Sequence, residues 1–209
     1  MTNTITVDTL TRWLTGFADR VTEQREYLTE LDSAIGDADH GANMARGMAS
    51  VVDKIGQDPA ATADALLKTT GMTLVSSVGG ASGPLYGTFF LRMGASAGAV
   101  PELDAAALGA ALRAGYEGIL QRGKAEPGDK TMIDAMLPAL DAYDAAAVSG
   151  SLADALAAAS AAAAEGRDAT EPLVARKGRA SYLGERSAGH IDPGSASTAL
   201  LFDALAAAA

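Results

Sequence analysis

Apolar side chains recur at steps of three and four residues along most of this 209-residue chain, which is the spacing of one face of an α-helix. The opening stretch has this spacing throughout, at Leu10, Trp13, Leu14, Phe17, Val21, Leu28, Leu31 and Ile35. Asp8 or Thr9 is a suitable N-terminal cap, and Gly36 is a natural stop. The pattern therefore predicts that one long helix opens the chain and ends before Gly36.

Seven further helices are expected from the same spacing, with glycine and proline residues at most of their ends. Their approximate ranges are 40–55, 60–78, 84–98, 104–121, a helix capped by Asp129 or Thr131, 151–164 with a continuation toward 174, and 193–207. Pro138 predicts a kink or a break. Because no convincing strand and no break in composition is seen, we expect one all-α domain over residues 1–209.

Composition supports a folded helical protein. The chain is 48% hydrophobic and only 20% charged, alanine is abundant, and aromatic residues are sparse. Small side chains let helices approach closely, so a compact antiparallel assembly fits.

Charge and residue usage exclude several classes of function. A net charge of -10 disfavours nucleic-acid binding, and the absence of cysteine excludes disulfides, thiolate chemistry and Cys-zinc sites. The N-terminus lacks the order of a signal peptide, and no apolar run is long enough to cross a membrane. We therefore expect a cytoplasmic protein without a nucleic-acid or membrane partner.

Three carboxylates, Asp32, Asp37 and Asp39, lie within eight positions at the junction of two expected helices. Aspartate is common as a helix cap and in turns, and capping is the ordinary interpretation of this stretch alone. Crowded carboxylates also repel one another unless a cation lies between them, and Mg²⁺ prefers such oxygen ligands. The alternative is therefore a site for magnesium and a nucleotide.

A glycine-rich loop at 79–87 precedes the helix that Pro84 opens. Exposed backbone N–H groups at a helix N-terminus bind phosphate, and Ser82 adds a hydroxyl donor. The loop matches neither a Walker A motif nor a dinucleotide-binding fingerprint. Close packing of small residues at a helix crossing explains it equally well.

Basic residues gather in the irregular stretch 176–195, with four of them between 176 and 186. Arg179 is the candidate for contacting a phosphate, since a guanidinium group binds it with two hydrogen bonds. Lys130 is a second candidate, and Met132 a contact for a base, although capping and core packing are favoured for that stretch. His190 is expected to be structural, whereas His40 follows the carboxylates and is placed to donate to a phosphate oxygen.

The stretches 32–43, 79–87, 128–138 and 178–195, in this order, resemble the nucleotide-binding L subunit of dihydroxyacetone kinase, a domain that also forms the C-terminal half of single-chain kinases. The resemblance covers nearly the whole chain. It implies an antiparallel barrel of eight α-helices with the nucleotide site at one end. Ala38 stands where the acidic motif often has glycine, and Ile191 where glutamine is common, but neither change removes an expected ligand.

The resemblance also implies the residues of the site. The Mg²⁺ ligands, commonly for two ions, are Asp32, Asp37 and Asp39. The contacts to ADP or ATP are His40, Gly41, Ala42, Asn43, Ala81, Ser82, Gly123, Met132 and Arg179, and the residues that close the site are Asp192, Pro193 and Gly194. Arg179 would also neutralise charge during transfer, and no other catalytic residue is expected on this chain.

The implied reaction is phosphoryl transfer from a magnesium-bound nucleotide to dihydroxyacetone. The chain is expected to lack the domain that holds dihydroxyacetone, which in the family is bound covalently to a histidine of a separate K subunit. In phosphoenolpyruvate-dependent systems the ADP stays bound and a phosphotransferase M subunit rephosphorylates it.

Two alternatives stay open. One is a subunit that exchanges free ATP or serves another ketose or polyol. The other is a regulatory module that binds a transcription regulator. The resemblance also leaves a homodimer open.

Overall fold

The computed structural model describes residues 4–209, which form nine α-helices, one 3₁₀ helix and a small sheet. The helices are α1 (Val7–Glu23), α2 (Arg25–Ile35), α3 (His40–Gln57), α4 (Ala63–Ser77), α5 (Ser82–Ala97), α6 (Ala105–Gly123), α7 (Ile133–Ala147), α8 (Leu152–Ala169), η1 (Arg179–Ser187) and α9 (Pro193–Ala208). The all-α class expected from the sequence is confirmed. None of the helices in this described part is long and apolar enough to cross a membrane.

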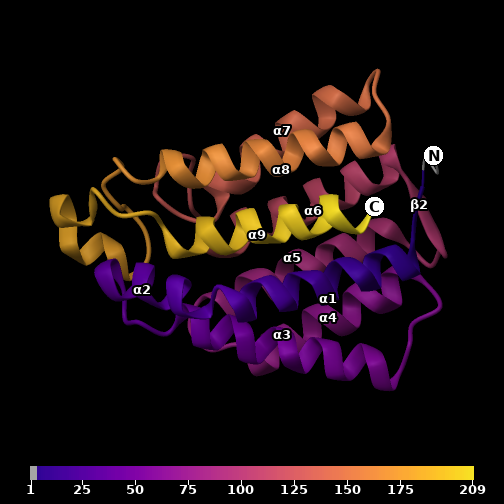
Figure 1. Cartoon of the computed structure of the whole chain (residues 1–209), viewed down its shortest axis with the longest axis horizontal. Coiled ribbons are helices and arrows are strands. Elements are labelled where there is room, and N and C mark those ends of the chain that lie inside the picture. The colour runs from indigo at the N-terminus through magenta and orange to yellow at the C-terminus, as the bar shows by residue number, and fades with distance from the viewer. Residues whose placement is uncertain (1–3) are drawn as a thin grey trace.

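Eight of the helices pack in a closed cycle along the long axis of the molecule (Figure 1). Each helix from α3 to α8 contacts the next in chain order, while α1 contacts both α3 and α9. This cyclic order is compatible with the expected barrel. The remaining α-helix, α2, lies at one end with η1, and it contacts α3, α9 and η1 (Figure 1).

The core consists of the inward faces of these helices. Trp13 and Phe90 lie with ring centroids 5.6 Å apart, and Phe17 lies 6.2 Å from Tyr86. The buried indole N–H of Trp13 donates to the carbonyl of Leu201 at 2.9 Å, which joins the first and last helices. The expected core faces are therefore correct, but several helix boundaries differ.

The expected long first helix is two helices, separated at Gln24. Residues 22–27 are all exposed, so no core contact holds this turn in line with the helix on either side. The cap is also different, since Thr6 and not Asp8 or Thr9 caps α1, accepting from the N–H of Thr9 at 3.2 Å.

Of the kink or break expected at Pro138, the break is wrong, because α7 runs through this residue, and the kink stays a prediction. Proline removes the N–H that would bind the carbonyl of Asp134. Gly166 of α8 lies against that carbonyl, where an added Cβ would be 2.5 Å from the oxygen. The neighbouring helix therefore packs onto the carbonyl that Pro138 leaves unbonded.

Two short strands were not expected from the sequence. β1 (Thr4–Thr6) pairs antiparallel with β2 (Glu102–Asp104), with Ile5 opposite Leu103. Three residues are too few for an alternating pattern to be detected. The sheet lies at the opposite end of the molecule from α2 (Figure 1).

Candidate functional site

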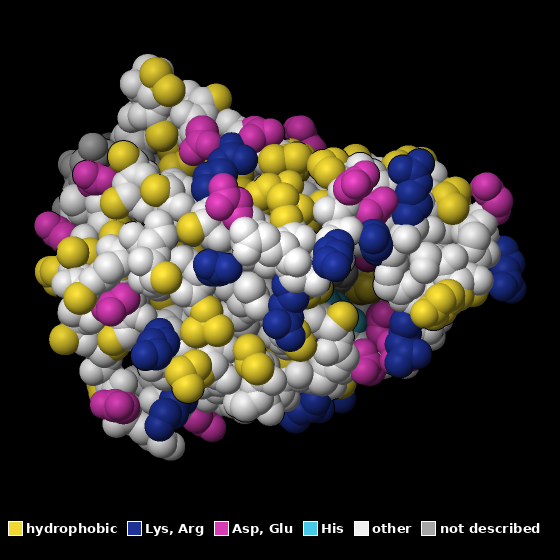
Figure 2. Space-filling model, turned by 180° about the vertical axis from the view of Figure 1, so that it is seen from behind, with side chains coloured by type: hydrophobic (Ala, Val, Ile, Leu, Met, Phe, Trp, Pro, Cys, Tyr) yellow, Lys and Arg dark blue, Asp and Glu magenta, His cyan; other side chains and the backbone are white. Residues whose placement is uncertain are grey.

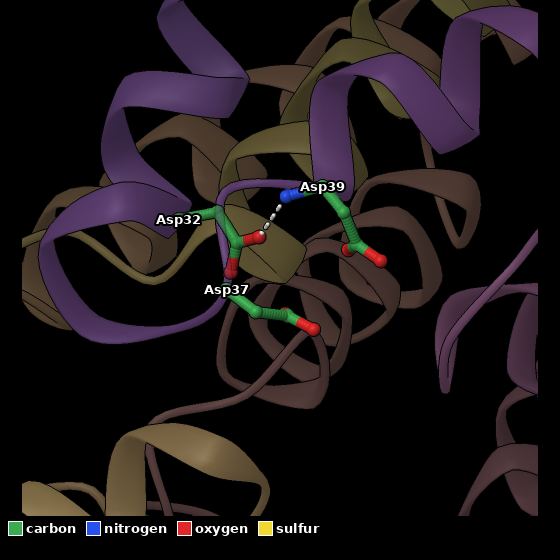
Figure 3. A group of neighbouring side chains, drawn as sticks. All are labelled: Asp32, Asp37 and Asp39. Carbon is green, nitrogen blue, oxygen red and sulfur yellow. Dashed lines mark hydrogen bonds between the residues drawn. The ribbon is translucent and has the colours of Figure 1, made fainter.

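The three aspartates converge where α2 ends and α3 begins. Asp32 lies in the last turn of α2, while Asp37 and Asp39 lie in the turn that follows (Figure 3). One carboxylate oxygen from each lies within 4.8 Å of the others. This is a cluster of hard oxygen ligands, which fits a divalent cation such as Mg²⁺.

Local hydrogen bonds fix the shape of this turn. One oxygen of Asp32, Oδ2, accepts the N–H groups of Asp39 at 2.8 Å and His40 at 3.1 Å. Asp39 occupies the N-cap position of α3 but makes no side-chain capping bond. Capping therefore explains part of the role of Asp32 and leaves Asp37 and Asp39 available for a ligand.

Two small residues make the turn sterically feasible. A Cβ at Gly36 would overlap the carboxylate of Asp32, so glycine is required there. Ala38 has φ 62°, in the left-handed region that favours glycine. The departure from the family pattern at this position therefore introduces local strain.

Arg179 is the basic residue that reaches the cluster. Its Nε lies 2.9 Å from Oδ2 of Asp37, which brings η1 against the turn after α2. The side chains are 68% and 37% exposed, so water screens the ion pair and it adds little to stability. Within residues 4–209 it is the sole ion pair of the three aspartates, so the cluster keeps a net negative charge.

The glycine-rich loop faces the same cluster. A Cβ at Gly80, which has φ 66°, would lie 3.9 Å from a carboxylate oxygen of Asp39. Ala81 is the N-cap of α5 and provides no capping side chain, so first-turn N–H groups are free of a side-chain cap. Gly83 packs instead against the carbonyl of Val78. The position of Gly80 therefore fits the phosphate-binding interpretation of the loop, and that of Gly83 fits the close-packing interpretation.

A buried chain of polar groups leads from this loop into the core through His40. Its Nδ1 lies 3.0 Å from the hydroxyl of Ser82, and its Nε2 lies 2.9 Å from the hydroxyl of Ser197. The hydroxyl of Ser197 also lies 3.1 Å from the carbonyl of Gly194, which can accept its proton. The hydroxyl of Tyr86 lies 2.7 Å from the same oxygen.

In a neutral His40 one ring nitrogen donates and the other accepts, so Ser82 and Ser197 take opposite roles toward the ring. Burial lowers the pKa of His40, although Asp32 and Asp39 act in the opposite direction. Burial also raises the pKa of Tyr86 to about 12, so it stays protonated. The side chain of His40 thus contacts Ser82 and Ser197, and its donation to a phosphate oxygen stays a prediction.

Two adjoining cavities open beside these groups, and Figure 2 shows acidic and histidine side chains in a hollow with basic side chains at its rim. The first cavity has a volume of about 200 Å³ and is lined by the three aspartates, the glycine-rich loop, η1 and the start of α9. The second, of about 300 Å³, is lined mainly by apolar side chains, including Leu85, Ile119, Met132 and Ile133. Ala81, Leu85 and Met132 are among the residues that both share.

The start of α9 closes the first cavity. Asp192 caps this helix by accepting the N–H of Ser195 at 2.6 Å, and its own N–H donates to the hydroxyl of Thr170 at 3.0 Å. The pKa of Asp192 is raised to about 7, mainly by burial, with smaller contributions in the same direction from Asp134 and Asp32, while the Ser195 N–H and Lys130 act to lower it. The carboxyl group of Asp192 is therefore partly protonated near neutral pH.

Most of the expected site residues line one of the two cavities. These are Asp32, Asp37, Asp39, His40, Ala81, Ser82, Gly123, Met132, Arg179, Asp192, Pro193 and Gly194. Gly41, Ala42 and Asn43 do not, because they lie in the first turn of α3 behind the aspartates. Gly41 packs on the carbonyl of Arg25, and Asn43 accepts from Arg46 at 2.6 Å. Contact of these three with a nucleotide stays a prediction.

Sequence reasoning missed the roles of Tyr86, Ser197 and Lys130. The signal for Ser197 is a group of hydroxyl residues in the otherwise apolar helix 193–208. Lys130 lines the first cavity, but its ammonium is bound by backbone carbonyls, and the phosphate contact considered for it stays a prediction. The expected caps Asp129 and Thr131 are wrong, since Met132 is the N-cap of α7.

The chain is similar to known proteins over nearly its whole length. Residues 34–207 match the family model described as the DAK2 domain. The ADP-binding subunit DhaL of a PEP-dependent dihydroxyacetone kinase from Escherichia coli is 48% identical over 201 residues, which are 96% of each chain. The corresponding PTS-dependent subunit from Lactococcus lactis is 45% identical over 96% of this chain and 97% of its own.

A solved structure supports the same relationship. The dihydroxyacetone kinase of C. freundii, in complex with AMP-PNP and Mg²⁺, superposes with a TM-score of 0.73 at 28% identity. The match covers 95% of this chain and 33% of that longer chain. The chain therefore belongs to the DAK2 domain family, which confirms its resemblance to the nucleotide-binding L subunits of dihydroxyacetone kinases.

Proposed function

We propose that this chain is the ADP-binding subunit of a phosphoenolpyruvate-dependent dihydroxyacetone kinase, a phosphotransferase that presents a magnesium-bound nucleotide to a substrate held on another subunit. The observation that carries this proposal is the convergence of three carboxylates with the N-terminus of α5 beside an apolar cavity. The names of the relatives support the choice of ADP and of dihydroxyacetone.

Asp32, Asp37 and Asp39 would hold magnesium, commonly as two ions. Bound Mg²⁺ would neutralise phosphate charge and bridge phosphate oxygens. The carboxylates are already oriented for this, because Asp32 is fixed by two backbone N–H groups and the oxygens of all three are close together.

The phosphate chain would lie between the aspartates and the start of α5. Free N–H groups and the helix dipole favour an anion there. Ser82, held by His40, borders the same space, and Arg179 reaches it from η1. These groups orient the phosphates and offset their charge, which is most of what phosphoryl transfer requires of a protein.

The base would occupy the second cavity. Its lining of Leu85, Ile119, Met132 and Ile133 provides apolar surface for a planar ring. Gly123 borders this cavity, where a side chain would narrow the entrance. Because this cavity adjoins the first, one nucleotide would fill both.

Dihydroxyacetone, which accepts the phosphoryl group, would be activated on another subunit. Among the described residues that line the two cavities, His40 is the one imidazole, and hydroxyl groups engage both of its nitrogens. A K-type subunit that carries dihydroxyacetone would therefore bind at the end of the molecule formed by α2 and η1 and receive the phosphoryl group there. After it leaves, an M subunit would bind at the same end and convert the bound ADP back to ATP.

Reconstitution tests this proposal. The purified chain is titrated with ADP in the presence of Mg²⁺ or EDTA, and then mixed with a K subunit, dihydroxyacetone and either labelled ATP or a phosphorylated M subunit. Magnesium-dependent binding and transfer from the M subunit are expected. Efficient turnover with free ATP would favour the exchanging kinase. Nucleotide binding without transfer to dihydroxyacetone or another ketose would overturn the kinase function.

A further inference from the structure

Lys130 is a buried lysine whose ammonium group is surrounded by backbone carbonyl oxygens. The residue is 1% exposed. Its Nζ donates to the carbonyls of Thr170 at 2.9 Å, Glu171 at 3.3 Å, Leu173 at 3.0 Å and His190 at 2.5 Å. An ammonium group has three N–H bonds, so these four oxygens share them.

These carbonyls come from two separate segments. Thr170 is the C-cap of α8, and Glu171 and Leu173 follow it, where the helix dipole places partial negative charge. His190 lies two residues before Asp192, which begins the segment that closes the first cavity. The ammonium therefore connects the end of α8 to the closing segment, and Thr170 reinforces this by accepting the N–H of Asp192.

The backbone of Lys130 belongs to a different wall of the site. Thr131 and Met132, which follow it, line both cavities. Asp134 holds this loop by accepting the N–H groups of Gly128 at 2.5 Å and Thr131 at 2.7 Å. The side chain thus extends from the wall of the proposed base pocket to the carbonyls behind the closing segment.

The conformation of Lys130 is unfavourable in itself. Its φ is 64°, in the left-handed region, and burial of the ammonium lowers its pKa. The carbonyl contacts act against both penalties, and Asp192 and Glu171 also favour the charged ammonium. The two walls also meet directly, since a Cβ on Gly194 would lie 3.4 Å from Met132.

We propose that Lys130 is a positioning residue that couples the wall formed by Thr131 and Met132 to the closing segment Asp192–Gly194. Although Lys130 borders the first cavity, its ammonium donates to backbone carbonyls. Its ammonium holds the carbonyl of His190, so the closing segment keeps the position in which it completes the nucleotide site. The nucleotide measurements below rest on the proposed function, whereas the exchange measurement does not.

Lys130→Ala tests this coupling, because it removes the last four heavy atoms of the side chain, Cγ to Nζ. Propylammonium has the same four heavy atoms, so it can replace them when added to the solution. We expect faster hydrogen exchange at residues 188–194 in the free protein, and Mg-ADP binding weakened by about tenfold or more. Added propylammonium is expected to restore both, whereas 1-propanol, which has the same length and no charge, is not. Lys124→Ala is the matched control, since Lys124 is exposed and also has positive φ, at 50°.

Lys130→Arg is the second variant if Lys130→Ala does not fold. It keeps the charge, but a planar guanidinium cannot direct its donors to the same four oxygens. We expect a folded protein with a raised KM for nucleotide, or a raised Kd, and little change in kcat. Wild-type exchange and affinity in a folded variant would overturn the proposal, and so would failure of both variants to fold. If the wild type itself binds no ADP, the proposed function fails and the exchange result still decides the role of Lys130.

Discussion

Replacing Asp192 by asparagine removes a buried carboxyl group without changing its shape. The side chain caps α9 through the N–H of Ser195, at 2.6 Å, and asparagine retains an oxygen for that bond. The residue is 8% exposed, and Asp134 and Asp32 add negative charge to its surroundings. We therefore expect Asp192→Asn to stabilise the folded protein at neutral and alkaline pH.

The magnitude follows from the raised pKa of this carboxyl group. Asp192 loses its proton near pH 3.8 in the unfolded chain and near pH 7 in the folded protein. Between these values only the unfolded chain is ionised, so raising the pH favours unfolding. The stabilisation present below pH 3.8 is thus lost as the pH rises through about 7. A difference of about three pH units corresponds to about 4 kcal/mol.

Urea denaturation at a series of pH values measures this effect. Wild type and Asp192→Asn are compared between about pH 4 and pH 8 with EDTA and without nucleotide, so that no ligand alters the charge of the site. The difference in free energy of unfolding is expected to grow with pH and to level off above about pH 7. Asp53→Asn, at an exposed position of α3, is the control for loss of a surface carboxylate. If the free energy of unfolding changes with pH in the same way for wild type and Asp192→Asn, the pKa of Asp192 is not raised.

Three further substitutions test the turn and its buried support. Asp37→Asn is expected to abolish magnesium-dependent transfer while circular dichroism shows an intact helical fold, and full activity would contradict the metal role of Asp37. Ala38→Gly should relieve the left-handed strain at φ 62° and raise the free energy of unfolding by up to about 1 kcal/mol; a decrease would contradict that strain. Ser197→Ala removes the hydroxyl partner of Nε2 of His40, so nitrogen NMR should show the ring proton on Nδ1, which keeps Ser82 as its partner, and a ring protonated on Nε2 would contradict this pairing.

The sequence was sufficient to predict those features that depend on neighbouring residues. The helices follow from apolar spacing, and the three aspartates were recognisable because they lie within eight positions at a helix junction. The division of the first helix at Gln24 was missed because the apolar spacing continues across it, while six exposed residues deprive that turn of support. Periodicity reports which side of a helix is apolar, and it does not report whether the helix is continuous.

The support of the site depends on contacts between distant parts of the chain. His40 and Ser197 are 157 positions apart, and Lys130 binds carbonyls 40 to 60 positions away. A lysine that binds backbone carbonyls leaves no trace in the identities of its partners, since every residue carries a carbonyl group. Such a residue looks in the sequence like any surface lysine, and only the fold reveals its role.

The two interpretations of the aspartate stretch prove not to be alternatives. Asp32 satisfies two N–H groups at the junction with α3 through one oxygen, which orients its carboxylate toward those of Asp37 and Asp39. Because the capping bonds come from Asp32, the side chain of Asp39 at the N-cap position is not used for capping. The same bonds that stabilise the start of the helix therefore free two carboxylates and hold a third for a cation. Capping is thus the structural means by which this turn forms a ligand cluster.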